Sequence, residues 1–136
     1  MNYKATAALA AIFLAGCQSA TYPTAPASKP LTVDAPYQLT ASDVAAVKAG
    51  VASSLKDPTS PLFGEMKAVK GDTGVVTVCG YVNGKNSYGG YVGDKPFIGS
   101  IVGDEQKKGF VVIGMGGSDI DTQVTFNVCR QKGIHL

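Results

Sequence analysis

Histidine and tryptophan are almost absent from the sequence. His135 is the only histidine among 136 residues, and there is no tryptophan. We expect His135 to lie on a frayed chain end, where it is poorly placed to act as the general base of a Ser-His-Asp or Cys-His site. A zinc site with several histidine ligands is excluded as well. The sequence therefore predicts no catalytic residue, no metal site and no cofactor.

The sequence also lacks a strong charge of either sign. Twelve basic and ten acidic residues give a net charge of +2. Lys4 is the only charged residue in positions 1–16, so the rest of the chain contains 12 − 1 = 11 basic and 10 acidic residues. Nucleic-acid binding needs a basic patch, so we predict no nucleic-acid partner. After Cys17 no apolar run is long enough to cross a membrane.

The first 17 residues carry the most specific motif. Lys4 provides a positive charge, and residues 7–15 form an apolar run that is too short to span a bilayer. The run ends in Leu14-Ala15-Gly16-Cys17. This arrangement resembles the lipobox of bacterial lipoproteins. An ordinary signal peptide with a coincidental cysteine is the alternative.

The lipobox resemblance implies several properties. Residues 1–16 would be a signal peptide, and the Cys17 thiol would carry a diacylglycerol with a further acyl group such as palmitate on the new amino end. Two or three acyl chains anchor a protein stably, whereas one does not. The protein would then be attached to the cell envelope by lipid, and Gln18 in place of aspartate favours the outer membrane, facing the periplasm.

Residues 17–38 are predicted to form a tether between the lipid and a folded domain. They are rich in Pro, Ala, Ser and Thr, and four prolines prevent a continuous helix. Residues 39–136 are predicted to form a single domain, which is a suitable length for one modest core.

One amphipathic helix opens the predicted domain. Thr40 and Asp43 have the spacing of a capping box. Val47, Val51 and Leu55 then follow at a four-residue spacing that places them on one face. A proline at position 58 ends the helix. This face is expected to pack against a sheet.

Short extended segments broken by glycine follow. Strands are predicted near residues 65–70, 75–82, 91–102 with a break, 109–115 and 122–130. Sequential short strands with short connections favour an antiparallel meander. The predicted fold class is therefore α+β, with one amphipathic helix packed on a curved antiparallel sheet of four to five strands.

Cys79 and Cys129 remain once Cys17 is assigned to lipidation. Each lies in a predicted strand on the side opposite the apolar residues, so the two side chains could meet if the strands are neighbours. Exported proteins favour disulfides, and there is no Cys-x-x-Cys redox motif. We predict a structural Cys79–Cys129 disulfide.

Residues 78–97 are the most distinctive stretch, in which a strand leads into a glycine-rich, tyrosine-rich turn. Asn83-Gly84 is a turn signal, and the rings of Tyr88, Tyr91 and Phe97 are expected to cover the glycine backbone. One interpretation is a purely structural hairpin. The other is a partner-binding surface, because tyrosine offers a large rigid contact area with a polar tip. Its candidate residues are Asn83, Lys85, Asn86, Tyr88 and Tyr91.

The same stretch resembles small uncharacterised bacterial envelope proteins. In these, Leu-Lys-Asp-Pro precedes a Cys-Gly-x-Val-Asn-x-Lys-Asn-Ser-x-Gly-Gly-Tyr run. The matching residues here are Leu55-Lys56-Asp57-Pro58 and residues 79–91. The resemblance covers roughly the second half of the chain and implies no activity.

Three functions follow from these observations. The first is a non-enzymatic lipoprotein whose Cys79–Phe97 hairpin contacts an envelope protein or a cell-wall partner. The second is an inhibitor or exclusion factor, similar in size and placement to lipoproteins that block lysozymes. The third is an enzyme that uses Asp119, Asp121 or Lys85 as acid, base or cation. It is the least favoured, since no nucleophile, base and orienting group come together.

Overall fold

The computed structural model describes residues 34–136. The predicted signal peptide, the predicted lipidation of Cys17 and most of the predicted tether lie outside the described residues.

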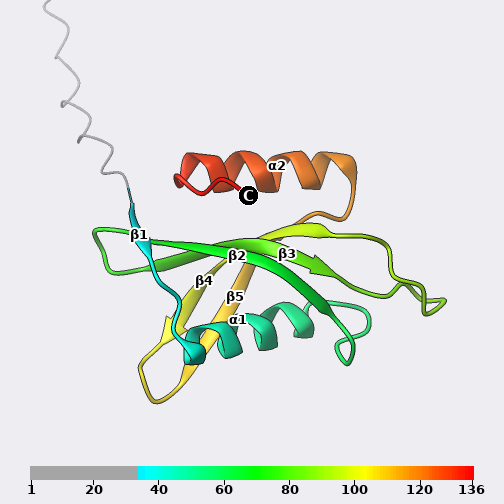
Figure 1. Cartoon of the computed structure of the whole chain (residues 1–136), viewed down its shortest axis with the longest axis horizontal. Helices are drawn as coiled ribbons and strands as arrows, with labels where there is room; N and C mark the ends of the chain where they lie inside the picture. The colour runs from blue at the N-terminus through cyan, green and yellow to red at the C-terminus, as the bar shows by residue number, and fades with distance from the viewer. Residues whose placement is uncertain (1–33) are drawn as a thin grey trace, which may run out of the picture. The chain divides into compact units, whose positions relative to one another are not determined.

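The fold is an antiparallel sheet between two helices (Figure 1). The sheet is a meander in which the strands lie in the order β1-β2-β3-β4-β5. This confirms the predicted α+β class and the predicted helix on the sheet. The strands are β1 (Ala35–Tyr37), β2 (Leu62–Lys70), β3 (Val76–Asn83), β4 (Lys95–Gly103) and β5 (Lys108–Met115).

Helix α1 (Ala41–Ser53) is the predicted helix. Thr40 is its N-cap: the backbone N–H of Asp43 donates to the Thr40 hydroxyl, and the Asp43 carboxylate accepts from the Thr40 backbone N–H. This reciprocal pairing satisfies two backbone donors at the start of the helix. Val47 and Val51 are fully buried, so the predicted face does pack on the sheet.

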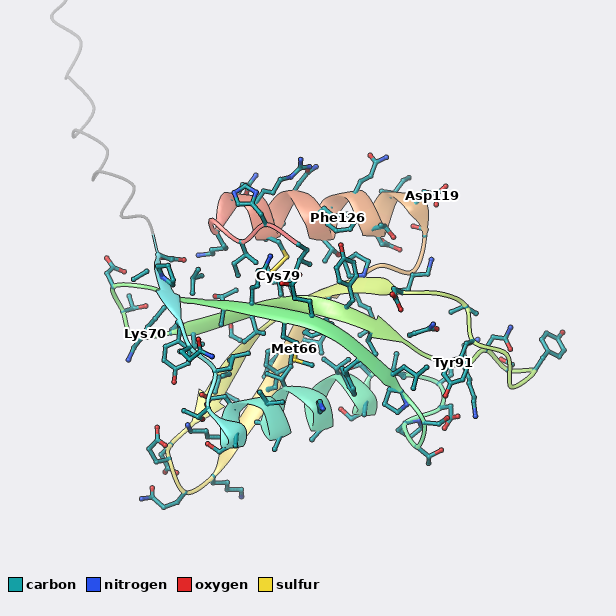
Figure 2. All side chains as sticks on the ribbon, in the orientation of Figure 1. Met66, Lys70, Cys79, Tyr91, Asp119 and Phe126 are labelled. Carbon is teal, nitrogen blue, oxygen red and sulfur yellow. A yellow bond between two sulfur atoms is a disulfide. The ribbon has the colours of Figure 1, made fainter. Side chains whose placement is uncertain are left out.

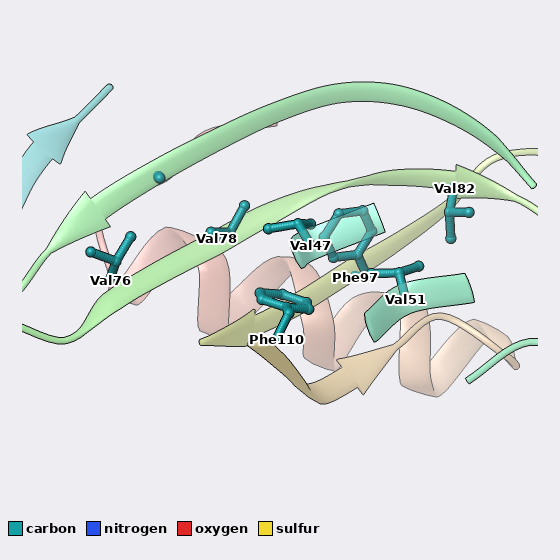
Figure 3. Close-up of a cluster of buried hydrophobic side chains, with 8 residues drawn as sticks. Val47, Val51, Val76, Val78, Val82, Phe97 and Phe110 are labelled. Atoms are coloured by element: carbon teal, nitrogen blue, oxygen red, sulfur yellow. The ribbon is translucent and has the colours of Figure 1, made fainter. Parts of the chain in front are cut away.

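The main core lies between α1 and the sheet (Figure 3). Alternate residues of β3 contribute Val76, Val78 and Val82 to it, which confirms the predicted sidedness of this strand. Phe97 of β4 and Phe110 of β5 meet edge to face, with ring centroids 6.1 Å apart. Both rings are buried, and large buried rings of this kind contribute strongly to the stability of a core.

Helix α2 (Asp119–Gln131) replaces the strand predicted at residues 122–130, so that prediction was wrong. Ser118 caps α2, and Asp121 completes a capping box with the same spacing as that of α1. The segment is rich in β-branched residues, which favour strands. The cap starts the helix, and packing on the sheet overrides the local preference.

Helix α2 covers the face of the sheet opposite α1 (Figure 1). Cys79 of β3 and Cys129 of α2 form a disulfide, as predicted, although it joins a strand to a helix and not two strands. Val69, Ile98 and Ile134 complete a small buried cluster around it. A second aromatic contact lies here, between Tyr81 and Phe126 with centroids 6.1 Å apart.

The chain end after α2 is packed and not frayed. Ile134 is buried in the cluster beside the disulfide, and Leu136 packs against that cluster. The Lys67 amine donates to the backbone carbonyl of His135 at 2.6 Å. The expectation of a frayed end was therefore wrong, because the apolar residues on either side of His135 dock on the sheet.

The two edges of the sheet differ. Strand β1 has three residues, one of which is Pro36, and it lies within the stretch predicted as tether. Strand β5 has eight residues, and none from Gly109 to Met115 is charged. Val111 and Ile113 on β5 are 53% and 65% exposed.

Candidate functional site

The connection between β3 and β4, residues 84–94, is the centre of the predicted binding hairpin. It projects beyond the sheet and both helices (Figure 1). Backbone hydrogen bonds close it: Asn86 N–H donates to the Gly90 carbonyl at 2.8 Å, and Gly89 N–H donates to the Asn86 carbonyl at 3.0 Å. Lys85 and Tyr91 pair across it as an isolated bridge. The loop therefore has a defined backbone despite its glycines.

Two predicted contact residues hold this backbone in place. The Asn86 side-chain carbonyl accepts from the N–H groups of Tyr88 at 2.9 Å and Gly90 at 3.1 Å. The Asn83 side-chain carbonyl accepts from the Gly93 N–H at 3.1 Å. Such side-chain bonds fix turns that glycine alone would leave free. The acceptor oxygens of both amides are thus used within the loop.

Tyr91 fastens the loop to the segment that follows α1. Its hydroxyl donates to the Ser60 carbonyl at 2.9 Å, and the Lys85 amine lies 5.3 Å from its ring centroid (Figure 2 shows the Tyr91 side chain). On the same segment, Ser60 and Thr59 hydrogen bonds lower the pKa of Asp57 to about 2, and the Lys85 charge adds to the effect. The loop is held at its base as well as at its tip.

Tyr88 stands apart from these contacts. Its side chain is 97% exposed, so the expectation that it covers the glycines was wrong. Phe97 does cover a glycine, but in the core: a Cβ on Gly80 would come within 2.8 Å of the ring. An exposed tyrosine on a fixed backbone loses little conformational freedom on binding, which is the property of an aromatic contact residue.

A pocket of about 380 Å³ lies at the base of the loop. Its walls come from three regions that are distant in sequence: the residues after α1, the two ends of the loop with the adjoining ends of β3 and β4, and the end of β5 with the two glycines that follow it. It contains three lysines and no carboxylate. The lining residues are Ser54, Leu55, Lys56, Val82, Gly84, Lys85, Asn86, Val92, Lys95, Met115, Gly116 and Gly117.

Sequence reasoning found Lys85 and Asn86 of this pocket but missed Lys56 and Lys95. Lys56 lies in the Leu55-Lys56-Asp57-Pro58 motif and Lys95 in the distinctive stretch of residues 78–97, yet nothing in their spacing indicates a shared cavity. Only the meander, which brings the ends of α1 and β5 beside the loop, places them together. Tyr88 and Tyr91 are not among the lining residues.

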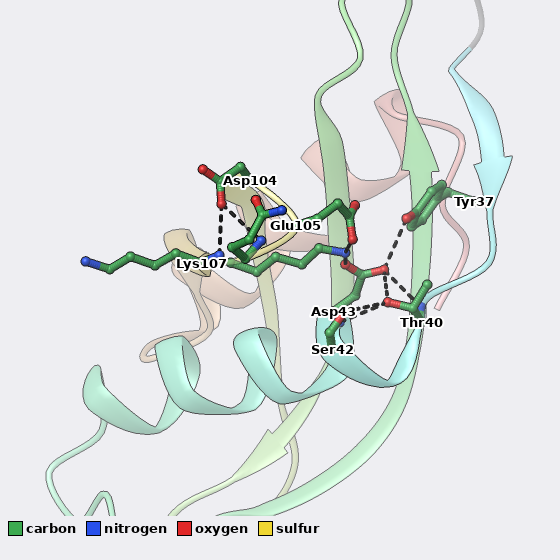
Figure 4. Close-up of polar contacts among 9 residues, drawn as sticks. Tyr37, Thr40, Ser42, Asp43, Asp104, Glu105 and Lys107 are labelled. Carbon is green, nitrogen blue, oxygen red and sulfur yellow. Dashed lines mark hydrogen bonds and ion pairs between the residues drawn. The ribbon is translucent and has the colours of Figure 1, made fainter.

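A second polar cluster is buried between α1 and the turn before β5 (Figure 4). The Lys108 amine lies 2.8 Å from the Asp43 carboxylate and 3.0 Å from Glu105, and the Tyr37 hydroxyl donates to Asp43 at 3.1 Å. Only 2% of the Asp43 side chain and 9% of the Lys108 side chain are exposed. No buried side-chain donor or acceptor among the described residues lacks a partner.

The charges of this cluster stabilise each other. Burial alone raises the pKa of Asp43, but hydrogen bonds from Lys108, Thr40 and Tyr37 outweigh it, so its pKa lies well below the usual value. The pKa of Lys108 is raised by its bonds to Asp43 and Glu105. Both groups stay charged at neutral pH and bond to each other, which suits a lock between α1 and β5 better than proton transfer.

The carboxylates proposed for catalysis lie at the start of α2. Asp121 accepts hydrogen bonds from the Ser118 backbone N–H and hydroxyl, at 3.1 and 2.8 Å. Asp119 belongs to the same helical turn, so both acids lie at the N-terminus of a helix and not in an extended segment. Residues 34–136 contain no group of three or more His, Cys, Asp or Glu side chains placed to hold a metal ion.

Comparison of the chain with protein-family models, with curated protein sequences and with solved structures finds no match. The resemblances noted from the sequence therefore stay predictions. Within the described part of the chain, no helix has the length and apolar character needed to cross a membrane. The disulfide is consistent with an extracytoplasmic location, since such bonds persist in oxidising compartments.

Proposed function

We propose that this protein is a lipid-anchored envelope protein that binds a partner through the β3–β4 loop and catalyses no reaction. Cys17 carries the lipid, residues 1–16 are the signal peptide that is removed, and the outer membrane facing the periplasm is the location. The partner is a protein or a component of the cell wall.

One observation carries this proposal: Tyr88 is 97% exposed on a loop whose backbone is held by Asn83, Asn86 and Tyr91. A loop with only a structural role gains nothing from an exposed aromatic ring at its tip. A preordered tyrosine gives a partner a large contact area at a small entropic cost. The five predicted contact residues thus divide into those that shape the loop and Tyr88, which meets the partner.

Site-specific photo-crosslinking in intact cells tests the proposed contact. A photoreactive phenylalanine derivative at position 88 of the full chain should capture one discrete partner, whereas the same residue at position 120 should not. Ile120 is the matched control because it is 75% exposed and lies on α2. Binding of the identified partner to the purified full chain should then weaken about tenfold or more in Tyr88→Ala, the loss typical of a central aromatic contact.

An unchanged affinity in Tyr88→Ala, or equal capture from positions 88 and 120, would return the loop to a structural role. The anchor is tested separately by metabolic labelling with an alkyne fatty acid. Label should appear on the native chain and be absent from Cys17→Ser. Label on both, or on neither, would remove the lipid anchor from the proposal.

A further inference from the structure

The pocket at the base of the loop suggests a second ligand, distinct from the partner at the loop tip. We propose that this pocket binds a small amphipathic anion: a short alkyl or acyl chain that ends in a carboxylate or a phosphate. This inference goes beyond the proposed function, because it concerns the pocket lining and not Tyr88.

The charge of the pocket is the first argument. Lys56, Lys85 and Lys95 line it, and no aspartate or glutamate does. The ion pairs within 4 Å among the described residues involve three other lysines, namely Lys67, Lys108 and Lys132.

The contacts of the three pocket lysines leave their charge available. The Lys56 amine reaches the Ser87 hydroxyl at 3.4 Å. Lys85 lies over the Tyr91 ring and lowers the pKa of Asp57 through its charge without forming an ion pair with it. Lys85 and Lys95 are half-buried, so part of their hydration is already lost. An anion placed among them would find positive charge without displacing an ion pair.

The floor of the pocket is the second argument. Leu55, Val82, Val92 and Met115 give it an apolar surface between the lysines. Its volume of about 380 Å³ lies within the range of roughly 300–1,000 Å³ typical of small-molecule sites. An inorganic anion would use the charge and leave the floor unfilled, whereas a neutral apolar molecule would leave the lysines without a partner. An amphipathic anion matches both.

The walls are preformed. Val92 N–H donates to the Gly84 carbonyl at 3.3 Å, and Gly116 N–H donates to the Pro96 carbonyl at 2.8 Å, so loop and strand ends are tied together. Leu55 lies against Gly84, where an added Cβ would come within 3.3 Å of it. A ligand would therefore need little rearrangement of the backbone.

The test uses isotope-labelled full chain with Cys17→Ser, which removes the proposed acylation site, in amide and methyl NMR titrations. The probes are octanoate and octyl phosphate, with acetate and octylammonium as controls. We expect both octyl anions to shift the signals of Leu55, Val92 and Met115, with an affinity at least tenfold above that of the two controls. The tighter of the two identifies the head group as carboxylate or phosphate.

Two variants locate the site. Lys56→Gln with Lys95→Gln should weaken octyl-anion binding by about tenfold, and the matched pair Lys48→Gln with Lys107→Gln, which has the same charge change outside the pocket, should not. Val92→Glu, at a half-exposed wall position, should abolish binding without disturbing the core. Amide spectra of all variants report whether they stay folded.

Three results would overturn the proposal: octylammonium binding as tightly as octanoate, shifts that map away from the pocket, or equal weakening by both lysine pairs. Tyr88→Ala separates this inference from the proposed function. It should leave octanoate binding unchanged, while the pocket lysine pair should leave partner capture through position 88 unchanged.

Discussion

Helices α1 and α2 cover opposite faces of one sheet but are attached by different interactions. α1 adds Val47 and Val51 to the main core and carries Asp43, which bonds to Lys108. α2 contributes a smaller buried cluster and a covalent bond through Cys129. Non-covalent packing and a buried ion pair thus hold one layer, whereas a disulfide holds the other.

This difference has a physical origin in the amount of apolar surface on each helix. Val47 and Val51 of α1 are fully buried, whereas Ile120 and Val124 of α2 are 75% and 54% exposed. A helix that buries less apolar area gains less from packing. A bond that restricts the unfolded chain supplies the missing stability without requiring more buried surface.

Removing the disulfide should have the largest effect. Cys79→Ser with Cys129→Ser should lower the free energy of unfolding by about 4 kcal/mol, the chain-entropy value for cysteines 50 residues apart. Hydrogen exchange should show α2 losing protection before α1. The measurement is denaturant unfolding together with exchange mass spectrometry. Equal loss of protection in both helices would show that α2 does not depend on the disulfide more than α1 does. As a control, added reductant should not lower the stability of the variant further.

Truncating the core under α1 should come second. Val51→Ala removes two methyl groups from a fully buried site and should cost about 2 kcal/mol, through lost transfer free energy and a cavity. Val124→Ala on the exposed side of α2 is the matched control and should change stability by less than about 0.5 kcal/mol. Thermal unfolding checks both, and similar losses would show that α2 depends on packing as much as α1.

The ion pair should make the attachment of α1 sensitive to acid. Because the pKa of Asp43 is lowered on folding, its stabilisation is present above about pH 4, the ordinary carboxyl pKa, and is lost as pH falls toward the folded value. Asp43→Asn should cost about 1.5 kcal/mol at pH 7, the lower end for a hydrogen bond to a charged group, because Lys108 keeps Glu105 as a partner. It should also flatten the decline below about pH 4. Unfolding curves from pH 7 to pH 2 measure this.

Asp57 is the internal comparison for this pH dependence, since its pKa is also lowered, to about 2, by Ser60 and Thr59. Part of the acid response should therefore remain in Asp43→Asn. A variant with the same slope as the native chain would show that Asp43 does not contribute to the acid response.

The two helix caps should give the smallest effects. Ser118→Ala and Thr40→Ala each remove a capping hydroxyl and should cost about 1 kcal/mol. Thr40 also donates its hydroxyl to Asp43 at 2.7 Å, so we expect Thr40→Ala to cost more. Equal losses in thermal unfolding would mean that the cap of α1 and the ion pair are independent.

The sequence allowed the α1 layer to be predicted because its signals are local. The Thr40–Asp43 box and the spacing from Val47 to Leu55 can be recognised without knowing the rest of the fold. The box at Ser118 and Asp121 has the same form but was overlooked, because β-branched residues follow it and favour a strand. The disulfide was correctly paired even so, because Cys79 and Cys129 are the two cysteines that remain once lipidation is predicted for Cys17, whichever element each of them lies on.

The candidate site was less predictable. The sequence indicated the distinctive loop and its residues. It could not show that Asn86 shapes the loop while Tyr88 is exposed, because this difference depends on hydrogen bonds that form only in the folded chain. Lys95 joins Lys56 through tertiary structure alone. The bond between Asp43 and Lys108 spans 65 positions and has no sequence signal.

The unequal edges of the sheet limit how copies of this domain can associate. Strand β5 has eight residues, of which only Lys108, the first, is charged. As an edge strand it has backbone N–H and C=O groups that a further strand could pair with. On the opposite side, β1 has three residues and pairs only with Ala68–Lys70 of β2, and Pro36 provides no N–H donor. Among the described residues, edge-to-edge pairing of two copies is therefore favoured at β5, where one long and nearly uncharged strand is available along its whole length, over the short β1 edge.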